Sequence, residues 1–235
     1  MRLLLIRHGQ TPANVLGVLE TDTPGPGLTE LGREQAAAIP DALASERIDS
    51  IYVSRLIRTL QTAAPLARMR NEMHRVALPG IHEIEAGELE GRSDDDAIKT
   101  YLKTVWAWGS GSLDPRIPGA EDGHEFFARF DADIARIAAD RAPDATAAVF
   151  SHGAAIRVWA AGRASNIATD FPGLKDLANT AVVVLEGSPE AGWVVTRWAG
   201  EPIGGPGLDD PTAHDVTGES SRVRSPRSTS PSNPS

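Results

Sequence analysis

The chain has 235 residues, of which 41% are hydrophobic and 23% charged, as in an ordinary globular protein with a substantial core. It contains no cysteine, which excludes disulfides, thiolate metal sites and a cysteine nucleophile. The formal net charge of −9 argues against non-specific nucleic-acid binding, which needs a basic surface. No apolar run has the length of a membrane span or a signal peptide, so we expect a cytoplasmic protein with no membrane partner.

The first strand is predicted at residues 3–6, four consecutive aliphatic residues that lead directly into Arg7, His8 and Gly9. A short apolar run that ends at a glycine is typical of a buried strand followed by a polar turn. In open α/β sheets, ligands bind beyond the carboxyl ends of the strands. We therefore expect the side chains of Arg7 and His8 to face a crevice.

Helices and short strands alternate through the middle of the chain. Thr29 is a typical N-cap residue, and Pro40 and Pro65 are expected to bend or split the helices that contain them. The apolar residues of 124–141 recur three and four positions apart, which indicates one helical face. The predicted helices cover residues 29–45, 56–69, 94–108, 124–141 and 154–162. The predicted later strands cover residues 48–54, 76–78, 145–150, 180–185 and 193–198, of which the last two form a hairpin.

The strand at 145–150 repeats the beginning of the chain, because it leads into Ser151, His152 and Gly153. A second strand that ends in a His-Gly pair suggests that two imidazoles meet at one edge of the sheet. From about residue 201 to residue 235 the chain is rich in Pro, Ser and Gly and has few apolar residues. Such a segment buries too little apolar surface to offset its ordering entropy, so we predict a disordered tail over residues 201–235.

Two arginines and two histidines could bind a phosphoryl group together. The planar guanidinium groups of Arg7 and Arg58 suit phosphate oxygens, and His8 and His152 could donate to the same oxygens or attack phosphorus when deprotonated. These four groups would stabilise the charge of a transferring phosphoryl group without a metal or cofactor.

A carboxylic acid is also needed, because an alkoxide leaves poorly unless it is protonated. Glu83 and Glu88, in the polar turn after the third predicted strand, are the candidates.

Five motifs in order resemble the histidine phosphatase superfamily (phosphoglycerate mutase-like, branch 1) over roughly residues 3–199. They are Arg7-His8-Gly9-Gln10-Thr11 with Asn14, residues 28–36, residues 54–63, His82-Glu83-Ile84 with residues 87–91, and Ser151-His152-Gly153. The resemblance implies an α/β three-layer sandwich, with a mostly parallel central sheet and helices on both faces, over residues 1–200.

The resemblance also implies roles for individual residues. His8 is the nucleophile, and Glu83, rather than Glu88, protonates the leaving group and then activates water. The phosphoryl group is held by Arg7, Arg58 and His152, and further donors are Asn14 and the backbone N–H of Gly153. Asn14 could equally cap the turn that follows it.

Two positions depart from the family pattern. Glu20 stands where many family phosphatases carry a glutamine that contacts phosphate, and a carboxylate there would be repelled. Either its loop is displaced or Glu20 faces another part of the substrate. Arg55 stands where the family often has a small or acidic residue, and at the rim of the pocket it could recruit a second anionic group.

Several other residues are expected to be structural. Glu85, Glu88 and Glu90 are interpreted as a solvated acidic turn rather than a metal site, since no further ligand lies at a recognisable spacing. The aromatic residues of the middle region are expected to pack in the core or a lid. They are Trp106, Trp108, Phe126, Phe127 and Phe130.

The predicted function is a metal-independent phosphomonoesterase that hydrolyses a small phosphorylated metabolite through a phosphohistidine intermediate. One alternative is a phosphoglycerate mutase, although residues 91–151 form a comparatively short segment in which Arg116 has no basic neighbour. A second alternative is a non-catalytic phosphate-binding scaffold. A homodimer could form through the edge of the terminal hairpin or the aromatic region. We expect an acidic to neutral pH optimum, since His8 must be unprotonated while Glu83 is protonated.

Overall fold

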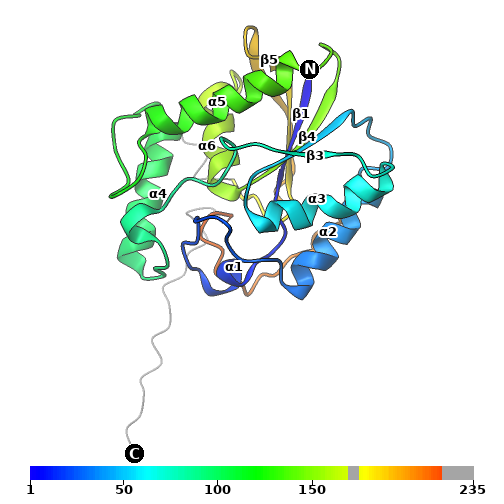
Figure 1. Ribbon diagram of the computed structural model, residues 1–235. Coiled ribbons are helices and arrows are strands. Elements are labelled where there is room, and N and C mark those ends of the chain that lie inside the picture. Colours follow the sequence, from blue (N-terminus) through cyan, green and yellow to red (C-terminus); the bar gives the residue numbers. More distant parts are fainter. Residues whose placement is uncertain (169–174, 219–235) are drawn as a thin grey trace, which may run out of the picture.

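A six-stranded mixed sheet forms the centre of the computed structural model, which describes residues 1–168 and 175–218 (Figure 1). The strand order is β3-β2-β4-β1-β5-β6. The first four of these strands are parallel, whereas β5 and β6 form an antiparallel hairpin. The strands are β1 (Arg2–Arg7), β2 (Ser50–Val53), β3 (Arg75–Ala77), β4 (Thr146–Ser151), β5 (Val182–Ser188) and β6 (Gly192–Trp198). The predicted fold class is confirmed.

Helices cover both faces of the sheet. In Figure 1, α2 and α3 lie on one side, and α4, α5 and α6 lie on the other. Pro40 and Pro65 lie inside α2 and α3, and neither proline splits its helix. Within the described ranges, no helix combines the length and apolar character needed to cross a membrane. The helices are α1 (Pro12–Leu16), α2 (Glu30–Ala42), α3 (Ile57–Met69), α4 (Asp95–Gly109), α5 (Gly123–Ala139) and α6 (Gly153–Arg163).

Strand β1 contributes to the hydrophobic core on each face of the sheet, because successive side chains of a strand point to opposite sides. Leu3 and Leu5 belong to the cluster that includes residues of α4, α5 and α6. Leu4 and Ile6 belong to the cluster that includes residues of α2 and α3. All four are buried. The strand that leads to His8 is therefore fixed from both sides.

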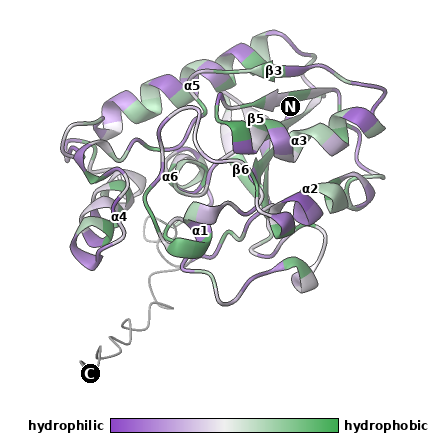
Figure 2. Cartoon of the chain, turned by 60° about the horizontal axis from the view of Figure 1, so that its bottom comes forward, coloured by the Kyte–Doolittle hydropathy of each residue, from purple (hydrophilic) through white to green (hydrophobic). Residues whose placement is uncertain are grey.

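The aromatic residues of α4 and α5 pack in the core, as predicted. Trp108 stacks on Phe126 with ring centroids 5.9 Å apart, and Phe130 stacks on Trp159 of α6 at 5.2 Å. All four rings are buried. In Figure 2, hydrophobic and hydrophilic segments alternate along α4 and α5, as expected of helices with one face against a core. These rings therefore serve packing between the helices.

The segment after β6 differs from the sequence prediction. Residues 201–218 lie against the domain, although the composition predicted a disordered tail for residues 201–235. Gln35 Nε2 donates to Leu208 O at 2.8 Å, and Gln10 Nε2 donates to Asp210 Oδ2 at 2.9 Å. The few apolar residues of the segment also contribute, since Val216 is buried in one core cluster and Ile203 packs against the other. The low overall apolar content of the segment did not reveal this attachment. Residues 219–235 lie outside the described residues.

Candidate active site

The two His-Gly motifs lie side by side at one edge of the sheet. Strands β1 and β4 are neighbours and parallel, with Arg7 opposite Ser151 in the register. His8 and His152, the next residues of each strand end, have ring centroids 5.2 Å apart. The predicted convergence of the two imidazoles is therefore present.

The hydrogen bond of His8 defines which ring nitrogen could attack a substrate. Nδ1 lies 2.8 Å from the carbonyl oxygen of Gly9. Because a carbonyl oxygen only accepts, Nδ1 carries the proton, and the lone pair of the neutral ring is on Nε2. Burial, followed by the positive charges of Arg58 and Arg7, holds the pKa of His8 well below its usual value. His8 is therefore an unprotonated imidazole at neutral pH, as nucleophilic attack requires.

His152 differs from His8 because side chains contact both of its ring nitrogens. Arg58 Nε donates to His152 Nδ1 at 3.2 Å, and Ser54 Oγ lies 2.7 Å from Nε2. Burial is the largest cause that holds the pKa of His152 well below its usual value. The charge of Arg58 and the interaction with His8 lower it further. In this arrangement His152 orients Arg58. Ser54, which the sequence prediction did not include in the site, supports the imidazole from the end of β2.

Arg58, the second residue of α3, brings a buried positive charge to the pocket. Its Nη2 donates to the backbone oxygen of Glu20 at 3.2 Å. Burial lowers the pKa of Arg58 to about 10, against the opposing influence of Glu83 and Glu20. The guanidinium therefore remains charged at neutral pH and lines a pocket together with His8 and Glu83.

The carboxylate of Glu83 is held by the beginning of α6. Oε1 accepts the backbone N–H of Ala155 at 2.8 Å and that of Ile84 at 3.0 Å, while Oε2 accepts the N–H of Ala154 at 3.2 Å. Orphan N–H groups at a helix N-terminus favour an oxygen acceptor. Glu83 is therefore fixed in the same pocket as His8, whereas Glu88 is exposed.

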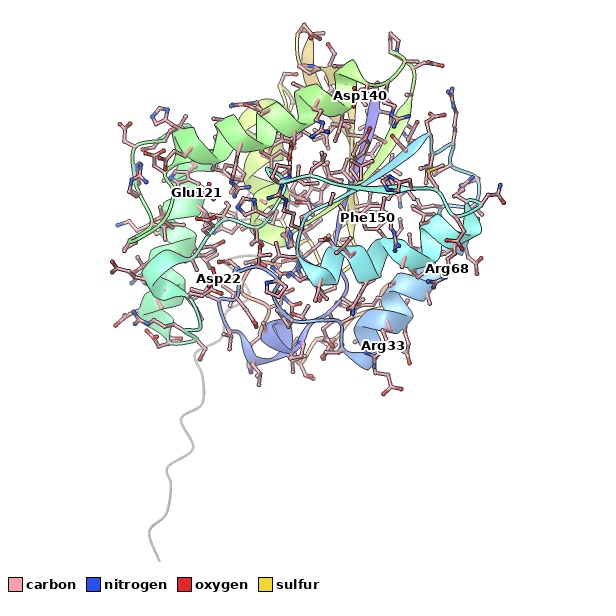
Figure 3. The ribbon with its side chains drawn as sticks, in the orientation of Figure 1. Asp22, Arg33, Arg68, Glu121, Asp140 and Phe150 are labelled. Carbon is pink, nitrogen blue, oxygen red and sulfur yellow. The ribbon has the colours of Figure 1, made fainter. Side chains whose placement is uncertain are left out.

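The turn that carries Glu83 is supported by Arg129 of α5. Arg129 donates to the backbone oxygens of Gly80 at 2.6 Å and Glu83 at 3.1 Å. It also forms an ion pair of 2.6 Å with Glu121, which lies just before α5 and is labelled in Figure 3. The sequence indicated only that α5 is amphipathic, so this support for Glu83 was not predicted.

Arg7 lies at the predicted edge, but a carboxylate contacts its guanidinium. Nη2 donates to Asp215 Oδ1 at 2.7 Å, and Nη1 donates to Asp215 Oδ2 and, at 2.9 Å, to the backbone oxygen of Leu177. The side chain of Arg7 is fully buried. Asp215 lies in the segment for which the sequence predicted disorder, and no sequence signal identified this contact.

Asn14 has the capping role that the sequence left open, and it also lies at the pocket. Its Oδ1 accepts the backbone N–H of Thr11 at 2.9 Å in the capping box of α1. Its Nδ2 donates to Asp215 Oδ1 at 3.2 Å, and the residue lines the pocket.

At Gly153, a Cβ would lie 2.7 Å from the backbone oxygen of Thr217 and 2.9 Å from Arg7 Nε. A side chain at position 153 would therefore displace its neighbours.

The structure also shows where Glu20 and Arg55, the two positions that depart from the family pattern, lie. Glu20 lines the pocket, so its loop is not displaced from the site, whereas Arg55 is exposed and does not line this pocket. The interpretation of Glu90 as a solvated side chain is wrong. Its carboxylate accepts the backbone N–H of Thr21 at 2.7 Å and that of Asp22 at 3.2 Å, which ties down the loop beside Glu20.

Comparison with known proteins agrees with this geometry. The family profile described as histidine phosphatase superfamily (branch 1) matches residues 3–200. The chain belongs to this superfamily. The family and the enzyme class predicted from the motifs are thus confirmed.

The relatives of this chain include a longer protein and several phosphatases. It is 39% identical over 227 residues to the PE-PGRS family protein PE_PGRS11 of Mycobacterium tuberculosis, a match that covers 88% of this chain and 38% of that relative. It is 32% identical over 129 residues to the adenosylcobalamin/alpha-ribazole phosphatase of Salmonella typhimurium, covering 55% of this chain and 62% of that enzyme. The chain therefore spans less than two thirds of the length of these relatives.

The solved structures give a more complete overlap. A mycobacterial glucosyl-3-phosphoglycerate phosphatase aligns with a TM-score of 0.72 at 25% identity, over 85% of this chain and 99% of that chain. The histidine phosphatase fold thus accounts for most of the described residues.

Proposed function

We propose that this protein hydrolyses small phosphomonoesters through a phosphohistidine intermediate formed on His8. The observation that carries the proposal is the state of the His8 ring, which is buried, neutral and fixed by Gly9 with the lone pair on Nε2. A group in this state is a nucleophile, and Arg58 beside it supplies the positive charge that a phosphoryl group needs. The charge is provided by side chains, so we propose a reaction independent of metal ions.

The first chemical step transfers the phosphoryl group to His8. Nε2 attacks phosphorus, a P–N bond forms, and the bond between phosphorus and the ester oxygen breaks. The departing oxygen takes a proton from the protonated carboxyl group of Glu83, so the alcohol leaves neutral. Arg58 and Arg7 stabilise the negative charge on the transferring group.

The second step releases inorganic phosphate. Water attacks phosphorus, the P–N bond breaks, and its electron pair returns to His8. The carboxylate of Glu83 takes a proton from the attacking water and regains its starting state. Both steps use Glu83 on the same side of the phosphoryl group, which agrees with a single pocket lined by His8, Arg58 and Glu83.

The substrate class is proposed as a small phosphorylated metabolite. The matched proteins named for an activity include a glucosyl-3-phosphoglycerate phosphatase, an adenosylcobalamin/alpha-ribazole phosphatase, a metal-independent phosphoserine phosphatase and a 6-phosphofructo-2-kinase/fructose-2,6-bisphosphatase. This range supports a phosphorylated metabolite as the substrate and does not select among such compounds. A cytoplasmic location and a homodimer remain predictions from the sequence.

The experiment is a parallel assay of p-nitrophenyl phosphate and 3-phosphoglycerate, with wild type, His8→Asn and the control His124→Asn. His124 is exposed on α5, contacts Asp114 and does not line the pocket of His8. We expect phosphate release by wild type and the control, and loss of release in His8→Asn. Acid-labile, alkali-stable labelling of wild type from a radioactive substrate would identify the phosphohistidine.

Other outcomes would contradict the proposal in distinct ways. Isomerisation of 3-phosphoglycerate much faster than phosphate release would identify a mutase. Equal release by wild type and His8→Asn, or no release by wild type, would favour the non-catalytic scaffold.

A further inference from the structure

The C-terminal part of the described chain passes over the active site. We call residues 213–218 the strap. Asp215, Val216 and Thr217 of the strap line the same pocket as His8 and Glu83. The strap lies beside α1, where the backbone N–H of His214 donates to Val15 O at 3.3 Å (Figure 1). A segment outside the six strands therefore forms one wall of the pocket.

The central contact of the strap is the ion pair between Asp215 and Arg7. Both carboxylate oxygens of Asp215 accept from the two terminal nitrogens of the Arg7 guanidinium. Thr217 Oγ1 accepts from Arg7 Nη2 at 3.1 Å, and Asn14 Nδ2 donates to Asp215 Oδ1 at 3.2 Å. Because Arg7 is fully buried beneath these groups, its fork of N–H donors is directed at Asp215.

The strap is anchored on the other side by α6 and by the segment before β5. Arg157 Nη1 donates to the backbone oxygen of Thr217 at 2.8 Å. The backbone N–H of Leu177 donates to the oxygen of Gly218 at 2.9 Å. These two contacts are hydrogen bonds to backbone oxygens, and Val216 is the one strap side chain that belongs to the core cluster. Detachment of the strap would therefore expose a single buried valine.

The carboxylate of Asp215 and a phosphoryl group have the same requirement. Each is an anion with two oxygens that can accept the parallel N–H groups of one guanidinium. The terminal N–H groups of Arg7 that Asp215 accepts from are not available to a phosphate, which leaves the side of the guanidinium at Nε, buried without a partner in the described part of the chain. A phosphate in the pocket would also be repelled by the carboxylate. Binding of one anion at Arg7 therefore opposes binding of the other.

We propose that the strap is an autoinhibitory segment, in which Asp215 occupies the place of a phosphate on Arg7. A phosphate-bearing ligand displaces Asp215 and opens the strap when it binds. The inference rests on the proposed function, since it assigns a regulatory contact to the same phosphate site. The apparent dissociation constant for phosphate is raised by the fraction of molecules in which the strap is closed.

The test measures binding of inorganic phosphate by calorimetry to the full chain, without turnover. Asp215→Asn keeps the shape of the side chain and removes its charge. Gly218→Ala leaves every charged group in place, but a Cβ at this position would overlap Arg7 Nη1 and the carboxylate of Asp215. Glu201→Gln is the matched control, because it removes one exposed negative charge from the same C-terminal segment.

We expect Asp215→Asn to bind phosphate about tenfold more tightly than wild type, since a hydrogen-bonded charge pair is lost from the competing state. Gly218→Ala should shift in the same direction, and Glu201→Gln should bind like wild type. In wild type, phosphate should also accelerate hydrogen exchange at two amides. The amide of Leu177 donates to Gly218 of the strap, and the amide of His214, within the strap, donates to Val15.

Weaker or unchanged phosphate binding in both Asp215→Asn and Gly218→Ala would overturn the strap proposal. Such a result would make Asp215 a positioning residue that orients Arg7. Failure of every variant to bind phosphate would also overturn it. These results do not depend on hydrolysis, so loss of the phosphatase proposal and loss of the strap proposal are distinguishable.

Discussion

The ends of β1 and β4 carry similar motifs and hold their histidines in different ways. His8 and His152 are both buried, and both have a pKa well below the usual value. His8 uses one ring nitrogen for a backbone oxygen, whereas His152 contacts Arg58 and Ser54 through both. Burial and pKa therefore do not distinguish the two histidines. In the proposed mechanism, the partner of the second ring nitrogen distinguishes His8 as the nucleophile from His152 as a positioning residue.

The largest expected difference comes from replacing each histidine with asparagine. His8→Asn should lower kcat by at least about 10⁴-fold, because the nucleophile is lost. His152→Asn should lower kcat by about 10²-fold, because Arg58 loses the partner of its Nε. Of the two variants, only His152→Asn should contain phosphohistidine when a reaction with radioactive substrate is quenched. Labelling of His8→Asn at His152 would reverse the two assignments.

Replacement of Glu83 tests the acid that acts on the other side of the phosphoryl group. Glu83→Gln should lower kcat on an alkyl phosphate by about 10² to 10⁴-fold, because the leaving alkoxide loses its proton donor. The effect on the first step with p-nitrophenyl phosphate should be smaller, since nitrophenolate leaves without protonation. Glu88→Gln, at an exposed position of the same region, is the control. A larger loss in the control would assign the acid to Glu88.

Ser54 tests whether His152 needs its second partner. Ser54→Ala should lower kcat/KM by about tenfold, because the buried Nε2 of His152 loses a hydrogen bond. The extent of His8 phosphorylation in a quenched reaction should match that of wild type. Ser50→Ala is a matched control on the same strand, since Ser50 Oγ is buried without a partner in the described part of the chain. Equal losses in both variants would indicate a general effect on β2.

The smallest expected effect is on stability as a function of pH. The pKa values of His8 and His152 are lower in the folded protein than the value of about 6.5 in the unfolded chain. Below pH 6.5 the unfolded chain binds protons that the folded protein does not, so the stability present above that pH is lost as the pH falls. His8 and His152 each contribute up to about 1.4 kcal/mol per pH unit to this slope.

Urea unfolding between pH 7.5 and pH 5.5 measures the slope, and His152→Asn should make it less steep. A free energy of unfolding that stays constant or rises on acidification would contradict the burial of neutral histidines. The same lowered pKa keeps His8 unprotonated somewhat below pH 6.5, in line with the predicted acidic to neutral optimum of activity.

The elements that the sequence predicted best are those with a strong local pattern. The apolar runs before Arg7 and Ser151 identified both strand ends, and the order of the motifs placed Arg58 and Glu83 at the same edge. Side chains that support the site from a distance in sequence were not predicted. Arg129 reaches the turn of Glu83 from α5, and its position in an amphipathic helix gives no indication of this contact.

The C-terminal segment shows a second limit of sequence analysis. Composition measures how much apolar surface a segment can bury, and residues 201–218 offer little. Asp215 and Thr217 are held by Arg7 and Arg157, whose burial depends on the fold of the rest of the chain. Polar contacts of this kind become visible only when the partner side chains are placed.

Strand β1 has one further consequence for how the protein loses activity on heating. Its amide hydrogens are enclosed between β4 and β5, and its side chains enter both cores. The amides of residues 3–6 should therefore exchange with solvent only when the whole domain unfolds, while those of residues 213–218 exchange by local opening. His8, the proposed nucleophile, would then stay correctly oriented up to the melting transition, so thermal inactivation and global unfolding should coincide.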